Sequence, residues 1–182
     1  DATMQFQPFE ALYSPDFPAP PPPPQRRYGL GRLLPPAIRD RIHALRTRLF
    51  PQLTFYDYEQ VWSHILRMER EGGVPAFPGA FVDWDNTARY GKRARLFRGA
   101  SPERFACWFR RLVEATAQRP PVERMIFLNA WNEWAEGNHL EPDQRHGSRY
   151  LEAVRDALAT QAGVSPEAAG PAGGPLREKV AS

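Results

Sequence analysis

The residues best suited to catalysis lie in the stretch FLNAWNEWAEGNHLEPD, residues 127–143. It contains four acids, two tryptophans and three asparagines, and it directly follows an apolar run. Cleavage of a glycosidic bond needs one carboxyl group that protonates the leaving oxygen and another that acts as base or nucleophile. Glu133 and Glu136, on a tight turn after a strand, could point into one cavity. The Glu-x-x-Glu spacing alone is weak evidence, because one glutamate could instead cap the last helix while the tryptophans fill the core.

The neighbouring side chains suit the recognition of a sugar. Tryptophan offers a flat apolar face on which a sugar ring can stack, while amide and carboxylate groups can bind hydroxyls. A second polar cluster, DWDNTAR at residues 83–89, follows another apolar run. The candidate substrate-binding residues are therefore Trp84, Asp85, Asn86, Arg89, Trp131, Asn132, Trp134, His139 and Glu141, with Glu133 and Glu136 as the candidate catalytic pair.

Other kinds of site have little support. The spacing of His139, Glu141, Asp143 and His146 fits no known ligand pattern, so we expect no metal. No P-loop, G-x-G-x-x-G or G-x-S-x-G motif is present, and we expect no cofactor. The single cysteine, Cys107, lies among apolar helix positions and is interpreted as a core thiol.

These clusters must be positioned by strands and helices that alternate along the chain. The apolar patterns predict strands at 1–6, 76–84 and 124–131, helices at 57–71 and 146–161, and a third helix that begins at Ser101. Alternation of this kind favours an α/β fold with parallel strands, in which working residues sit at the carboxyl ends. Three strands are too few to close a barrel, so we interpret the chain as the C-terminal part of a larger domain.

Two segments differ from this pattern. A Pro/Arg-rich region includes five consecutive prolines and a predicted basic amphipathic helix at 35–49, whose basic face is either solvated or in contact with a membrane surface. Residues 163–182 have a composition typical of a disordered tail. The net charge is +3, but the basic excess is confined to the Pro/Arg-rich region, which argues against nucleic-acid binding. No apolar run is long enough for a transmembrane segment.

Three motifs together resemble a known family. WDNTAR at 84–89, NAWNEWAEGNHLEPD at 129–143 and GSRYLEAVRDAL at 147–158 are similar to the WbsX-like family of glycoside hydrolase family 99-like domains. The resemblance covers about residues 1–158. It implies a (β/α)₈ TIM-type barrel, of which this chain would hold about the last three units while the N-terminal half is missing. The implied organisation is a partial domain at 1–162, with an insertion around 15–50, followed by a tail at 163–182.

The resemblance also implies roles for the two glutamates. Glu133 would be the base that assists attack by the 2-hydroxyl of the sugar itself, and Glu136 would be the general acid/base, with retention through a 1,2-anhydro sugar. Ala135 stands where family 99 hydrolases usually have histidine.

These observations predict a carbohydrate-active enzyme domain in bacterial lipopolysaccharide or surface-polysaccharide metabolism, acting on an oligo- or polysaccharide that could contain mannose or be lipid-linked. One alternative is a glycosyltransferase of O-antigen or polysaccharide biosynthesis, in which Arg89, Lys92, Arg93 and Arg95 grip a diphosphate. Another is a non-catalytic, sugar-binding remnant of a truncated barrel. The expected location is the bacterial cytoplasm, with membrane association as an option.

Overall fold

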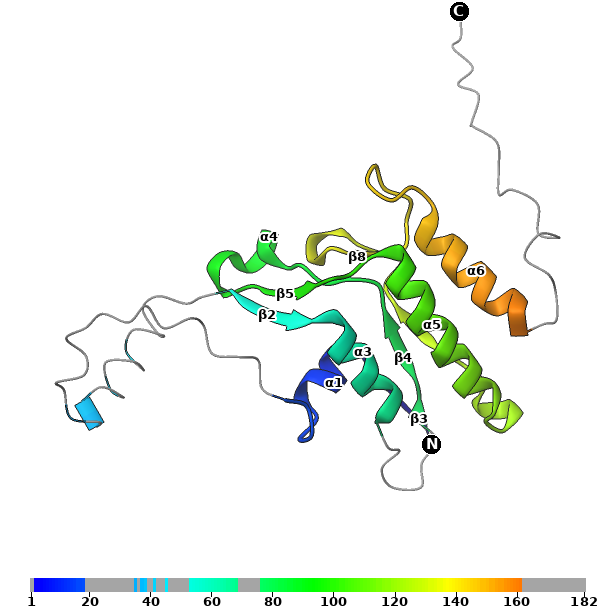
Figure 1. The fold of residues 1–182 in the computed structure, drawn as a ribbon, viewed down its shortest axis with the longest axis horizontal. Helices are drawn as coiled ribbons and strands as arrows, with labels where there is room; N and C mark the ends of the chain where they lie inside the picture. Colours follow the sequence, from blue (N-terminus) through cyan, green and yellow to red (C-terminus); the bar gives the residue numbers. More distant parts are fainter. Residues whose placement is uncertain are drawn as a thin grey trace, which may run out of the picture.

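A computed structural model of the protein describes residues 2–18, 53–68 and 76–161, together with isolated positions between 35 and 45. Figure 1 shows a mixed α/β arrangement in which short parallel strand pairs are flanked by helices. The α/β class predicted from the sequence is confirmed. The described strands form pairs and do not close a barrel.

The central strands run parallel and carry the predicted site at their ends. Strand β1 (Thr3–Met4) pairs with β3 (Ala76–Phe77), and β4 (Gly79–Phe81) pairs with β6 (Phe127–Asn129). The predicted strand at 76–84 is therefore two short strands, because Pro78 between them has no N–H to donate. At Gly79 a Cβ atom would lie 2.0 Å from the Gln5 carbonyl oxygen, so only glycine lets β1 approach this closely.

A third parallel pair corrects the sequence analysis. The sequence predicts no strand between residues 85 and 100 or between residues 53 and 57, but Arg95–Arg98 is strand β5, which pairs with β2 at Thr54–Asp57. Burial of Phe97 favours this strand. The centroid of its buried ring lies 5.1 Å from that of Phe81 and 5.5 Å from that of Tyr56. The charged residues around it obscure this one buried position in the sequence.

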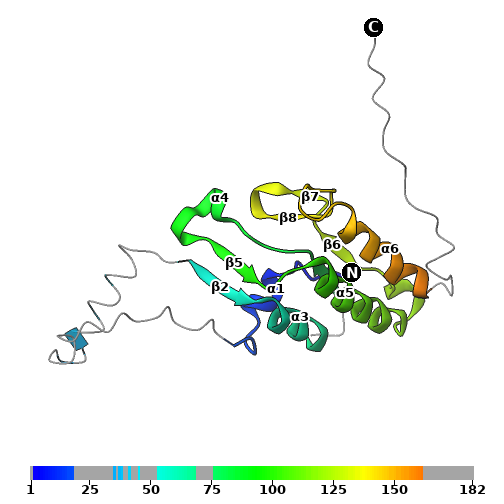
Figure 2. The same cartoon turned by 45° about the horizontal axis from the view of Figure 1, so that its top comes forward.

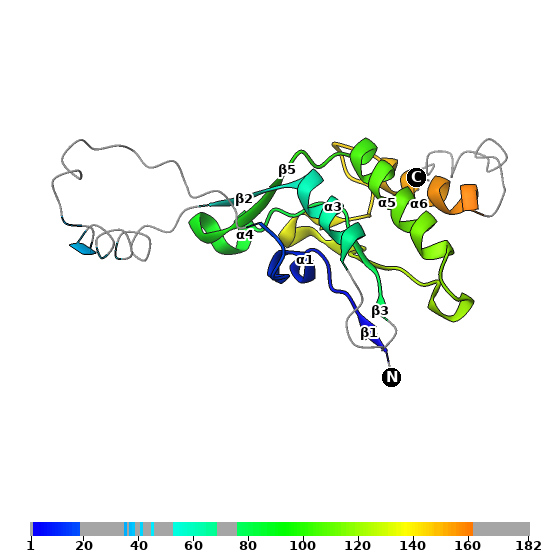
Figure 3. The ribbon, with the colours of Figure 1, turned by 60° about the horizontal axis from the view of Figure 1, so that its bottom comes forward.

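The helices predicted at 57–71, from Ser101 and at 146–161 are present, with shifted ends. They are α3 (Tyr58–Arg67), α5 (Pro102–Ala117) and α6 (Arg149–Gln161), and a short α1 (Phe9–Tyr13) follows β1. Figures 1 and 3 show α5 and α6 side by side. The core between helices and strands is aromatic, with Trp62 stacked on Phe81 and Phe105 in edge contact with both Trp62 and Tyr150.

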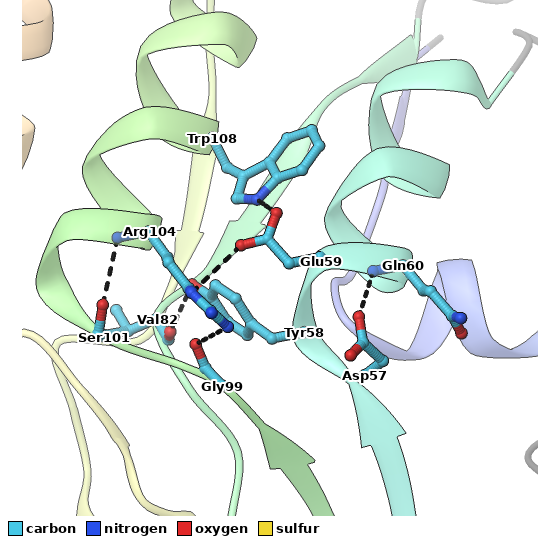
Figure 4. Close-up of polar contacts among 9 residues, drawn as sticks. All are labelled: Asp57, Tyr58, Glu59, Gln60, Val82, Gly99, Ser101, Arg104 and Trp108. Atoms are coloured by element: carbon cyan, nitrogen blue, oxygen red, sulfur yellow. Dashed lines mark hydrogen bonds and ion pairs between the residues drawn. The ribbon is translucent and has the colours of Figure 1, made fainter.

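Side chains cap the starts of α3 and α5 (Figure 4). The Asp57 carboxylate accepts a hydrogen bond from the Gln60 N–H at 2.9 Å, and the Ser101 hydroxyl accepts one from the Arg104 N–H at 3.3 Å. Each cap satisfies an N–H group that has no partner within its helix. The start of α3 and the start of α5 are thus fixed by local sequence.

The same region ties the two helices to the end of β4. In Figure 4, Glu59 of α3 accepts a hydrogen bond from the Trp108 indole N–H at 2.8 Å and pairs with Arg104 at 3.5 Å. The hydroxyl of Tyr58, a fully buried residue, donates to the Val82 carbonyl oxygen at 2.8 Å. These contacts hold the segment that leads from β4 into the polar cluster at 83–89.

Several predictions fall mainly outside the described residues, namely the insertion around 15–50 and the tail at 163–182. Of the apolar positions of the predicted basic helix, the described ones, Ile38 and Leu45, are both exposed. Within the described part of the chain, no helix is long and apolar enough to cross a membrane.

Candidate functional site

The polar ends of the central strands meet at one edge of the fold. Since β1, β4 and β6 are parallel, their carboxyl ends point the same way. The Asn129 amide donates to the Gln7 carbonyl oxygen at 3.0 Å, which joins the ends of β6 and β1. The Asp85 N–H donates to the Glu136 carbonyl oxygen at 2.8 Å, which joins the cluster after β4 to the motif after β6. The two clusters singled out in the sequence are therefore adjacent.

The motif after β6 folds into a small hairpin. Strands β7 (Asn132–Glu133) and β8 (Asn138–His139) are antiparallel and are joined by the 3₁₀ turn η4 (Trp134–Glu136). Gly137 ends the turn with φ of +62°, and a Cβ atom there would lie 3.2 Å from the Asp85 backbone nitrogen. This glycine lets the hairpin lie against the segment after β4. Figure 2 shows the hairpin on the same side of the molecule as α4 (Thr87–Tyr90).

One arginine contacts both candidate catalytic glutamates. Arg89 Nη1 lies 3.0 Å from Glu136 Oε1, and Arg89 Nη2 lies 3.6 Å from Glu133 Oε1. The Glu136 side chain is 13% exposed and that of Glu133 is 38% exposed, so both remain accessible. The short helix α4 positions Arg89, and the Asp85 carboxylate caps its start by accepting a hydrogen bond from the Thr87 N–H. A guanidinium between two carboxylates offsets the repulsion between them.

Two predicted substrate-binding residues are part of the packing in this structure. Trp84 is 3% exposed and makes an edge contact with the Phe9 ring at 4.8 Å. Asn86 is 6% exposed, and its side-chain oxygen accepts a hydrogen bond from the Arg95 N–H at 2.8 Å. Both residues therefore position the segment that carries Asp85 and Arg89.

The remaining predicted residues form a surface on the hairpin. The side chains of Trp131 and Trp134 are about half exposed. The Trp134 indole N–H donates to Glu141 at 2.6 Å, and its ring stacks on His139 with centroids 3.7 Å apart. Asn132 is exposed on β7. This surface offers aromatic faces and polar groups next to the glutamate pair.

A cavity of about 630 Å³ lies behind the hairpin. Its lining combines residues after β4, residues of the hairpin and residues before and within α6: Val82, Asp83, Asp85, Trp134, Gly137, His139, Pro142, Asp143, Gln144, Arg145, His146 and Tyr150. Neither Glu133 nor Glu136 is among them, and the cavity that the two glutamates were expected to share stays a prediction. Asp83, Arg145 and Tyr150 were not predicted as site residues, and the only signal for Asp83 was its place at the end of a buried strand.

Asp83 has an unusual electrostatic environment. Burial is the main cause that raises the pKa of its carboxyl to about 6, and the neighbouring Asp85 acts in the same direction. The Trp84 N–H, which donates to Asp83 at 2.7 Å, and the charge of Arg145 act against this. Burial, followed by the charge of Asp83, also raises the pKa of Tyr150. The described residues include no group of three or more His, Cys, Asp or Glu that could hold a metal ion.

The fold and site define an α/β protein with an acidic and aromatic site at the carboxyl ends of parallel strands. Residues 33–154 match the family model described as Glycosyltransferase WbsX, and the chain belongs to that family. Two proteins of Xanthomonas campestris pv. campestris, one from strain B100, carry the name "Uncharacterized protein WxcX" and are each 44% identical over 96 residues. That match covers 52% of this chain but 14% of each relative. No solved structure matches.

Proposed function

We propose that the chain is part of a carbohydrate-active enzyme domain that acts on glycosidic bonds in bacterial surface-polysaccharide metabolism. The observation that carries the proposal is the convergence of Glu133 and Glu136 on the single guanidinium of Arg89. Glycosidases work with paired carboxyl groups about 5–9.5 Å apart, flanking the bond that breaks. Two carboxylates that face one arginine, beside exposed tryptophans, suit such an arrangement. Membership of the WbsX family supports the substrate class.

The proposed mechanism gives each glutamate a separate proton transfer. Glu133 takes the proton of the sugar 2-hydroxyl while that oxygen attacks the anomeric carbon, and Glu136 gives its proton to the leaving oxygen. Water, deprotonated by Glu136, then opens the 1,2-anhydro ring at the anomeric carbon, and Glu133 returns the proton to the 2-oxygen. Configuration at the anomeric carbon is retained because it is inverted twice. Arg89 holds both carboxylates before the substrate enters, and Glu136 takes a proton from water when the substrate displaces the guanidinium, so that it can act as the acid.

The proposed scaffold is the C-terminal portion of a (β/α)₈ barrel. The parallel strands β1, β3–β4 and β6, with the candidate site at their carboxyl ends, are consistent with the last units of such a barrel. Other parts of the protein would supply the remaining strands. We assign residues 1–162 to this domain.

Conservative substitutions of the two glutamates test the chemistry. In the protein that contains this chain, Glu133→Gln and Glu136→Gln should each lower the release of sugar from α-mannosides or other glycans by about 10²–10⁴-fold, the usual contribution of one general acid or base. Glu114→Gln is the matched control, since Glu114 is exposed on α5 away from the site. Release is measured without any donor sugar. Unchanged turnover in both variants would contradict the catalytic assignment.

A glycosyltransferase is the second candidate, because the description of the matched family names that activity. Of the four cations considered for a donor diphosphate, Arg89 is engaged by the glutamates, and Arg95 donates to the Tyr13 hydroxyl at 2.7 Å and lies over its ring. Lys92 and Arg93 are exposed on the 3₁₀ turn η2 (Gly91–Arg93). This candidate is favoured if the protein transfers sugar from labelled nucleotide-linked or lipid-linked donors and releases no sugar from glycans when these donors are absent. If neither release nor transfer is observed, the result favours a non-catalytic, sugar-binding remnant.

A further inference from the structure

The cavity behind the hairpin is separate from the glutamate pair. Its walls come from the end of β4, from the β7–β8 hairpin and from the segment that leads into α6, whereas Glu133 and Glu136 meet at Arg89 on α4. Gly137 and Asp85, which are in close contact, form part of its wall. A volume of about 630 Å³ falls within the usual range of about 300–1,000 Å³ for small-molecule sites. The cavity therefore needs its own explanation.

Asp83 is the lining residue that most suggests a ligand. Within the described part of the chain, its carboxylate accepts a hydrogen bond from the Trp84 N–H and from no side chain. Tyr58 and Tyr150, both close enough for their pKa values to respond to its charge, are neutral acids that cannot neutralise it. A half-buried carboxyl with a raised pKa and free acceptor positions is typical of functional sites.

The charges around the cavity restrict the ligand class. Asp83, Asp85 and Asp143 contribute three carboxylates, while Arg145 contributes one permanent cation. Asp143 is engaged by His139 at 3.1 Å and by the His146 backbone N–H, and Asp85 accepts a hydrogen bond from the Thr87 N–H, which leaves Asp83 as the carboxylate with the most free acceptor positions. Carboxylates accept hydrogen bonds from hydroxyl and ammonium groups and repel anions. A phosphate or a uronic acid is therefore disfavoured.

We propose that this cavity is a second sugar-binding site, which takes a ring bearing hydroxyl or amine groups and no anionic group. The choice of a sugar rests on the proposed function. Asp83 accepts hydrogen bonds from the ring, Arg145 donates to its oxygens, and Trp134 belongs to both the cavity lining and the exposed hairpin surface. The cavity would hold one unit of a glycan while a neighbouring unit lies at the glutamate pair.

Calorimetric titration tests the site in the protein that contains this chain, carrying Glu133→Gln so that the probes stay intact. The probes are the methyl glycosides of mannose, glucosamine and glucuronic acid. We expect Asp83→Leu to weaken binding of the mannoside and the glucosaminide at least about tenfold, the usual effect of removing a charged hydrogen-bond acceptor. Asp156→Asn is the matched control, because this acid is on α6 outside the cavity lining and pairs with Arg155.

Two further variants keep the test informative if Asp83→Leu does not fold. Asp83→Asn should reduce the preference for neutral over anionic glycosides, and Arg145→Gln should weaken binding of the mannoside. The proposal is overturned if Asp83→Asn and Arg145→Gln bind all three probes as the control does, or if the glucuronide binds most tightly to the unsubstituted cavity. If the proposed function is wrong, the protein with both glutamates intact will show no turnover. The binding measurements at the cavity do not depend on turnover, so the two failures can be told apart.

Discussion

Arg89 is the residue that links the two halves of the candidate site. It is carried by the segment after β4, yet it contacts both glutamates of the motif after β6. Exposed ion pairs usually contribute little to stability, so this arrangement is better explained by a task at the site than by a need of the fold. In the proposed function, Arg89 holds two like charges close together until a sugar enters between them. Its guanidinium suits this role because its fork of donors can engage two carboxylates at once.

Substitution of Arg89 should therefore affect activity more than stability. We expect Arg89→Ala to lower kcat/KM for glycan turnover by about 10–10³-fold and Arg89→Lys to recover only part of the loss, because an ammonium group cannot reproduce the two-pronged contact. Thermal unfolding of both variants should stay close to that of the unsubstituted protein. Arg110→Ala on the exposed face of α5 is the control. Loss of folding without loss of specific activity would contradict this role for Arg89.

At the scale of secondary-structure elements, the site is held by contacts between helix α3 and the end of β4. The phenol of Tyr58 is fully buried and donates to the Val82 carbonyl oxygen, one residue before Asp83 (Figure 4). Tyr58→Phe removes this donor and leaves a buried carbonyl without it, which should lower the free energy of unfolding by about 1–3 kcal/mol. Chemical denaturation measures the change, with Tyr90→Phe on the exposed side of α4 as the control. A change of under about 0.5 kcal/mol would show that water or another donor replaces the hydroxyl.

The sequence predicts those elements whose signals are local. Asp57 and Ser101 mark the starts of α3 and α5 by capping, and apolar stripes mark their buried faces. The pair β2–β5 carries no comparable signal, because each strand is four residues long, is rich in charged or polar residues, and gains its hydrogen bonds from a distant segment. The same reasoning applies to the site. The motif places Glu133 and Glu136 on one turn, but the cavity is assembled from three segments and Asp83 becomes significant only when Tyr150 and Arg145 lie beside it.

For the whole molecule, Asp83 makes the free energy of unfolding depend on pH. Its pKa is raised from 3.8 to about 6 on folding, so the folded state binds the proton more tightly than the unfolded state. Below about pH 4 the group is protonated in both states and its effect on stability is most favourable. As the pH rises towards 6, the unfolded state loses the proton first, and stability falls by up to about 3 kcal/mol before it levels off.

Asp83→Asn should remove this dependence, since an amide does not titrate. The measurement is the difference in unfolding free energy between the unsubstituted protein and Asp83→Asn, taken from denaturant titrations between pH 4 and pH 8. Relative to the variant, the unsubstituted protein should become less stable as the pH rises from about 4 to about 6.5, and the difference should then stay constant. Other groups near Asp83, including Asp85, Arg145 and Tyr150, are present in both proteins, so their own titrations largely cancel.

A difference that is flat with pH, or that rises, would show that the carboxylate is solvated or paired in the folded protein. A gain in stability at neutral pH combined with weaker sugar binding would show that Asp83 is retained for recognition at the expense of the fold.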